Sequence, residues 1–174
     1  MSAIKLNSAS GGGSVSFEGP GTSSDDKVIK LPASPGVIVQ VVQVTTNNGV
    51  SLATSTWTTT GLEASITPSS SSNKVLIQLV SPMTGSPENS SGSLKVYRGG
   101  VSGTSVESEA GGLSTQDSEN DSYSDAVITY VDSPSTTSAT TYTVMMSRKG
   151  DSGEYSFNRD GKQTASLILM EVSG

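Results

Sequence analysis

Oxygen-bearing side chains at alternate positions in the run QDSENDSYSD (116–125) are the first candidates for chemistry. Hard cations such as Ca²⁺ bind carboxylate oxygens at this kind of spacing. The EF-hand loop, however, requires Gly at its sixth position and Glu at its twelfth, where this chain has Ser122 and Ile128. The run therefore favours a solvated acidic loop over a metal site. The candidate calcium ligands are Asp117, Glu119, Asp121 and Asp125.

Catalytic groups are scarce in this sequence. The chain contains no Cys and no His, which excludes disulfides, a Cys nucleophile and the usual general base near neutral pH. The tetrapeptide GDSG at 150–153 is similar to the nucleophile loop of serine proteases. Without His that nucleophile lacks its base, so we interpret GDSG as a turn. We expect neither enzyme activity nor a cofactor.

Aromatic side chains offer a second kind of site, because exposed aromatic rings stack on sugars. The candidates for glycan contact are Trp57, Tyr97 and Tyr123. Trp57 lies in the Thr-rich segment ATSTWTTTG, and we favour a role for this lone Trp as a cap on the core. Tyr97 and Tyr123 neighbour charged or polar residues and stay open as glycan contacts.

Charge and composition narrow the classes of partner. A net charge of −6 argues against a nucleic-acid partner, because phosphate binding needs clustered Lys and Arg. The first residues, MSAIKLNSAS, lack the apolar core of a signal peptide, and no apolar run approaches the ~18 residues that span a membrane. We expect synthesis in a cytoplasm and no membrane insertion. The hydrophobic fraction of 32% is low, which suggests that partner chains complete the core.

The elements that position these residues are short strands. Runs of Val, Ile, Thr and Tyr, bounded by turn residues, predict an all-β fold of two sheets. The first 36 residues read as an N-terminal extended arm with strand-like pieces at 14–20 and 27–32, followed by a head domain over 37–174. We expect the segment 100–123 to be irregular. The predicted head strands are 37–46, 61–68, 74–83, 93–99, 124–133, 140–149, 154–159 and 165–174.

The predicted strands are of two kinds. Those starting at Gly61, Ser93 and Thr140 alternate apolar and polar residues, which is typical of a sheet with one side in water. The strands that begin at positions 37, 74, 125 and 165 are apolar on both faces and need cover on both sides. No helix is predicted that could supply it, so another copy of the chain is the simplest cover.

This division of strands resembles the trimeric jelly roll of the tumour-necrosis-factor and complement-head type. In that family the first, third, sixth and last strands form an inner sheet around a threefold axis. The resemblance implies a jelly-roll sandwich that forms a homotrimer, with Gln78 near the axis. The residues expected at the trimer interface are Gln40, Val42, Leu76, Gln78, Val80, Val127, Ile168 and Met170.

Three stretches also resemble virion proteins of marine and freshwater bacteriophages: ITPSSSSNKVLI (66–77), VDSPSTTSATTYTV (131–144) and SLILMEVSG (166–174). The arm sequence GGSVSFEGPGTSSDDKVIKLP (12–32) resembles a short module near the start of phage fibre and appendage proteins. The resemblance implies a structural protein on the virion surface that binds the major capsid protein or another virion protein. The residues expected to attach the arm are Val15, Phe17, Val28, Ile29 and Leu31.

Several functions stay open at this point. A capsid-decorating (cement or knob) protein comes first, because an arm of 36 residues is too short for a fibre shaft. A short tail-fibre or receptor-binding protein, with the loops at 82–92 and 100–123 on host surface glycan, is the alternative. A secreted lectin would need an export route. The four serines of ITPSSSSNK are expected at an exposed corner, where the chain crosses from an outer to an inner strand.

Overall fold

The computed structural model describes residues 3–7, 14–18, 36–85, 91–106, 112–114, 122–149, 153–158 and 163–174. The chain divides into two compact units, Met1–Ala33 and Ser34–Gly174. In the first unit, β1 (Ala3–Asn7) pairs antiparallel with β2 (Ser14–Glu18). The predicted strand at 14–20 is therefore present, with a partner that the sequence did not suggest. The predicted piece at 27–32 lies outside the described residues.

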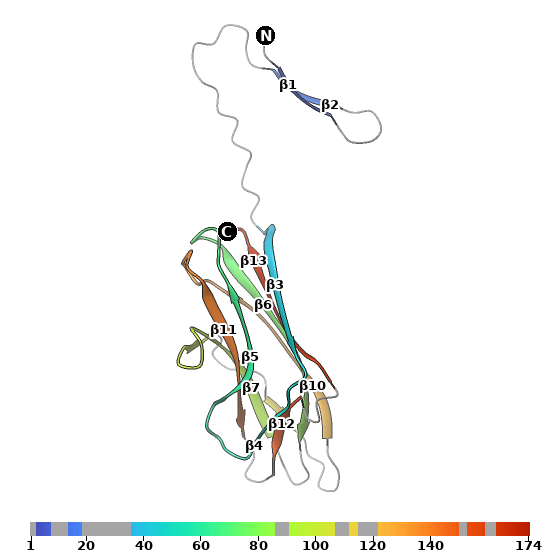
Figure 1. Ribbon diagram of the computed structural model, residues 1–174, viewed down its shortest axis with the longest axis vertical. Coiled ribbons are helices and arrows are strands. Elements are labelled where there is room, and N and C mark those ends of the chain that lie inside the picture. Colours follow the sequence, from blue (N-terminus) through green and yellow to red (C-terminus); the bar gives the residue numbers. More distant parts are fainter. Residues whose placement is uncertain are drawn as a thin grey trace. The chain divides into compact units, whose positions relative to one another are not determined.

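The second unit is an all-β sandwich of two antiparallel sheets, as predicted (Figure 1). Its described residues form no helix. The strands are β3 (Ile38–Thr46), β4 (Val50–Leu52), β5 (Thr58–Ile66), β6 (Lys74–Gly85), β7 (Ser91–Arg98), β8 (Thr104–Ser105), β9 (Gly112–Ser114), β10 (Ser122–Asp132), β11 (Thr140–Arg148), β12 (Tyr155–Phe157) and β13 (Ala165–Val172).

The sheets separate the two kinds of strand seen in the sequence. The first sheet has the order β3-β13-β6, with β10 on the other edge of β6. The short β12 pairs with Met83–Gly85 of β6, and β4 pairs with β12. The second sheet has the order β5-β11-β7-β8, with β9 also paired to β7. All four doubly apolar strands lie in the first sheet, and the three alternating strands lie in the second. This division confirms the pattern argument.

Three short strands were missed. β4 has three residues, and β8 and β9 lie within 100–123, the segment that was expected to be irregular. Both β8 and β9 pair with β7 and extend the second sheet. Segments of two or three residues are too short to show an alternation of polar and apolar side chains, so their sequence carried no strand signal.

The core lies between the sheets and is closed at one end by Tyr155. This side chain is fully buried among apolar residues from both layers. A Cβ atom added to Gly92 would lie 1.9 Å from Cδ1 of Tyr155, so the ring rests directly on the backbone of β7. Gly92 is therefore the point at which β12 of the first sheet packs against the second sheet.

Candidate functional site

A large apolar surface covers the outward side of the first sheet. Met170 on β13 is opposite Val41 on β3 and Leu76 on β6, and Leu76 is opposite Val131 on β10. Two further rows run parallel to this one, because residues two apart share a face. We call the three rows the valine face. Its members are Val41, Met170, Leu76 and Val131, then Gln43, Ile168, Gln78 and Thr129, then Thr45, Ser166, Val80 and Val127.

The valines of this face are open to solvent. Val127 is 63% exposed, Val41 57%, Val131 50% and Val80 39%. Strands lie ~4.8 Å apart and alternate residues ~6.7 Å apart, so the three rows cover roughly 400 Å². Seven of the twelve members are apolar, and a contiguous exposed apolar patch commonly marks an interaction site. The middle row carries three polar side chains, with Gln78 between Ile168 and Thr129, and the third row carries Thr45 and Ser166.

The predicted interface residues on β6, β10 and β13 all lie on the valine face. The two on β3 do not. Val42 is opposite the buried Leu169, and Gln40 is opposite the buried Glu171, so both belong to the core side of the sheet. Side chains alternate with a period of two, so an error of one position moves every residue to the other face. The residues of β3 on the valine face are Val41 and Gln43.

Gln40 belongs instead to a buried cluster around Glu171. The Glu171 carboxylate, which has no exposed surface, accepts hydrogen bonds from Gln40 Nε2 (2.6 Å), from Ser69 N and Oγ (both 2.7 Å) and from Asn73 Nδ2 (2.5 Å). Burial by itself raises the pKa of Glu171, but the hydrogen bonds from Asn73, Ser69 and Gln40 outweigh it and lower the pKa to about 2. The ionised carboxylate therefore fixes both ends of the four-serine connection between β5 and β6.

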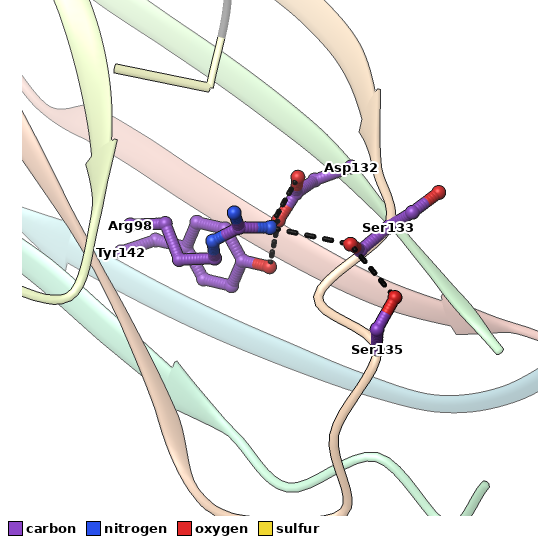
Figure 2. A network of polar contacts seen from close by, with 5 residues as sticks. All are labelled: Arg98, Asp132, Ser133, Ser135 and Tyr142. Atoms are coloured by element: carbon purple, nitrogen blue, oxygen red, sulfur yellow. Dashed lines mark hydrogen bonds and ion pairs between the residues drawn. The ribbon is translucent and has the colours of Figure 1, made fainter. Parts of the chain in front are cut away.

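A second polar cluster links the two sheets (Figure 2). Arg98 Nη1 on β7 donates to both carboxylate oxygens of Asp132 at the end of β10, at 2.8 and 2.9 Å. Tyr142 on β11 donates its hydroxyl to Asp132 Oδ2 at 2.7 Å. Burial, followed by the bond to Asp132, raises the pKa of Tyr142 above its ordinary value. The hydrogen bonds of Arg98, Asp132 and Tyr142 are made to one another, which indicates that the cluster holds the two sheets together rather than forming a catalytic site.

The aromatic candidates do not gather in one place. Trp57 is partly buried but is not among the residues of the core, so the expectation that it caps the core was wrong. Its ring centroid lies 6.5 Å from that of Tyr97, and the ammonium groups of Lys95 and Lys149 lie 4.9 and 5.5 Å from it. Tyr123 lies in β10, and its side chain is outside the described part of the molecule.

Other predicted sites fall largely outside the described residues. Asp117, Glu119 and Asp121 do so, whereas Asp125 is exposed on β10. Within the described ranges, no group of three carboxylates could hold a metal ion, and no helix could span a membrane. Val15 and Phe17 lie in β2, but nothing is described of their side chains. Val28, Ile29 and Leu31 are outside the described ranges, as are residues 150–152 of the GDSG turn.

Two residues of functional interest were not singled out from the sequence. Lys95 and Lys149 were not connected with Trp57, although Lys95 and Tyr97 share a face by simple alternation. That alternation was the available signal for Lys95. Lys149 follows the end of β11, and nothing in the sequence places it near Trp57.

No protein-family model matches this chain, and no curated protein matches it. Among solved structures, a chain from the Gx strain of infectious bursal disease virus is similar over 88% of this chain and 44% of its own, with 14% identity and a TM-score of 0.47. The VP2 chain of a subviral particle of that virus is similar over 88% of this chain and 43% of its own, with 12% identity and a TM-score of 0.40.

A Bacillus endospore appendage of disulfide-linked pili is similar over 84% of this chain and 98% of its own, with 14% identity and a TM-score of 0.35. This chain thus spans less than half the length of the viral chains it resembles. All three TM-scores are below 0.5, so the function proposed below rests on the chain itself.

Proposed function

We propose that this chain is a non-enzymatic structural protein of a bacteriophage particle, which forms a homotrimer through the valine face and decorates the capsid. The observation that carries the proposal is the exposure of Val41, Val80, Val127 and Val131 on one flat sheet surface. Covering them with sister chains removes this hydrocarbon from water at ~25 cal/mol per Å². The sequence resemblance to phage virion proteins supports the part of the proposal that places the chain on a bacteriophage particle.

A second copy of the chain is the best cover for three reasons. The face spans four strands and has neither a carboxylate nor a basic group among its twelve members, so it suits an apolar partner. The polar middle row would meet its own symmetry mates, and Gln78 side chains can hydrogen-bond one another around an axis. A single polar position within an apolar interface commonly sets the number of subunits. The sheet that bears this face also contains β3, β6, β10 and β13, the strands that the resemblance to the trimeric jelly roll assigns to the inner sheet.

The association state tests the first half of the proposal. Sedimentation velocity on the full chain at micromolar concentration is expected to show a trimer. A monomer at that concentration would contradict the buried valine face. The test is independent of where the protein sits on a particle.

The location on the particle needs a second experiment. A capsid-decorating protein is retained on heads that lack tails, and cryo-electron microscopy would show threefold density on the capsid surface. The unit at 1–33 is proposed to attach the head to the major capsid protein or another virion protein, so a chain that begins at Ser34 should stay trimeric but fail to bind particles. Free trimers that bind host cells and are absent from tail-less heads would favour the tail-fibre alternative.

A further inference from the structure

The outward side of the second sheet carries an aromatic and cationic cluster that the trimer leaves open. Trp57 precedes β5, and Lys95 and Tyr97 lie on the side of β7 opposite to the core residues Leu94 and Val96. This side of the sandwich is opposite to the valine face. A trimer that forms through the valine face would therefore leave the cluster of Trp57, Tyr97, Lys95 and Lys149 uncovered.

The segment that carries Trp57 is held in place by hydrogen bonds to β11. Arg148 N donates to Thr54 O at 3.1 Å, and Ser147 Oγ donates to Ser55 O at 2.9 Å. Thr56 N donates to Thr54 Oγ1 at 3.2 Å within the segment. The backbone that leads to Trp57 is thus held in place before any ligand arrives, and preorganisation of this kind lowers the entropic cost of binding.

The charges of the cluster specify the chemistry of the ligand. Both ammonium groups lie within 6 Å of the Trp57 ring centre, where cations are attracted to the ring. Among the described residues the ion pair is that of Arg98 and Asp132, and neither lysine takes part in one. Two cations over the Trp57 ring, with the Tyr97 ring next to it, match a saccharide whose acidic groups bind the ammonium ions and whose sugar ring packs against Tyr97.

We propose that the cluster of Trp57, Tyr97, Lys95 and Lys149 binds an acidic glycan, a saccharide bearing carboxylate groups. Nucleic acid is a poorer fit, because its affinity depends on neutralising many phosphates and the chain has a net charge of −6. Glu63 lies on the second sheet beyond Thr143, which separates it from Tyr97. The negative charge of Glu63 repels a ligand carboxylate near β5, so the ligand's carboxylate is directed to Lys95 and Lys149.

The only tryptophan of the chain reports directly on this site. The full-length protein is titrated with a short oligogalacturonate, and Trp57 emission is expected to change in a saturable way. Raising NaCl from about 0.05 to 0.5 M should weaken binding at least tenfold, because salt screens the contacts between lysine and carboxylate. A neutral maltooligosaccharide of the same length should bind at least tenfold more weakly.

The variants separate a binding role from a structural one. Lys95→Gln combined with Lys149→Gln should weaken oligogalacturonate binding at least tenfold while the thermal midpoint stays within a few degrees. Lys74→Gln removes an exposed lysine from the other sheet and should bind as the parent does. Trp57→Phe, followed by calorimetry, should weaken binding and keep the fold.

Three outcomes would overturn the proposal. One is an unchanged Trp57 emission with every saccharide. Another is equal binding by the double lysine variant. The third is equal or tighter binding of single-stranded DNA or polyglutamate, which would make the cluster a general anion site. None of these readouts depends on the trimer or on attachment to a particle.

Discussion

The two outward faces of the sandwich differ in what they offer to water. On the second sheet the outward side chains hydrogen-bond one another across strands: Ser65 Oγ lies 2.7 Å from Thr141 Oγ1, and Thr143 Oγ1 donates to Glu63 Oε2 at 3.2 Å. On the first sheet seven of the twelve positions of the valine face are apolar, four of them exposed valines, although Gln43 Nε2 also donates to Ser166 Oγ there at 3.0 Å. Both sheets share one core, so this difference is not needed for folding. It indicates that the exposed valines of the first sheet are adapted to a partner. The second sheet is exposed at Glu63 and Ser65 on its outward side, whereas Thr143 and Met145 of β11 are buried there.

The largest expected effect comes from a charge on the valine face. Val127→Asp would place a carboxylate where a sister chain is proposed to pack, and burying an unpaired charge costs several kcal/mol. We expect the trimer to dissociate to a monomer that keeps its β-sheet circular dichroism. Sedimentation velocity and circular dichroism measure the two properties separately.

Ser65→Asp is the matched control, since it puts the same group on the solvent face of the second sheet, where Ser65 is exposed. It should stay trimeric. If both variants dissociate, or neither does, the two faces are not different in the way that their side chains suggest.

A smaller effect is expected from Glu171, which lies on the core side of the first sheet. Its pKa is lowered from 4.5 to about 2, so the folded state binds a proton less readily than the unfolded state. The carboxylate therefore stabilises the folded state above pH 4.5, and this stabilisation is lost as the pH falls toward 2. Denaturant unfolding at a fixed protein concentration, at pH 5 and pH 2.5, should show the loss.

Glu171→Gln should be less stable at pH 5 by about 2–3 kcal/mol, because an amide group then faces the donors of Ser69 and Asn73. It should also lack this part of the pH dependence. Glu63→Gln, an exposed acid on the other sheet, provides the control and is expected to change stability by less than ~0.5 kcal/mol. An unaltered pH dependence in Glu171→Gln would show that the carboxylate is not held as described.

Gly92→Ala tests the contact that joins the layers. The new methyl group would overlap the Tyr155 ring, and overpacking of a dense core costs ~1–3 kcal/mol. We expect a lower thermal midpoint and an unchanged subunit number. Gly61→Ala has no neighbour within 4 Å of the added atom but has a φ of +76°, so it reports the cost of backbone strain alone. A stability of Gly92→Ala equal to that of the parent would exclude the close contact.

The smallest effect is expected at Gln78. Gln78→Val makes the middle row of the valine face more apolar, so association should not weaken. The loss of the polar position should instead relax the choice of subunit number. Native mass spectrometry is expected to show dimers or tetramers beside the trimer. A purely trimeric population would mean that Gln78 does not specify the assembly.

Much of the head could be predicted because the pattern of apolar and polar residues in each strand indicates which of its faces are covered. The strand ranges at 74–83 and 140–149 differ from β6 and β11 by at most two residues at either end. The sequence also predicted that the four-serine connection crosses from the second sheet to the first, because apolar and polar residues alternate in β5 but not in β6. The candidate site was predicted less completely. Both faces of β3 carry apolar residues, so alternation alone could not tell which face is outward, and Gln40 and Val42 were assigned to the wrong one.

The sequence by itself determined which strands share a sheet and which chemistry is absent. Alternation of side chains records whether one or both faces of a strand are covered, and the lack of His and Cys needs no structure to read. Only the tertiary structure decided the partners of distant residues. It brought Asn73 to Glu171, placed the ammonium groups of Lys95 and Lys149 over the Trp57 ring, and put Val41 on the valine face. Those contacts depend on strand register, which many weak contacts between remote segments fix together and which no local pattern contains.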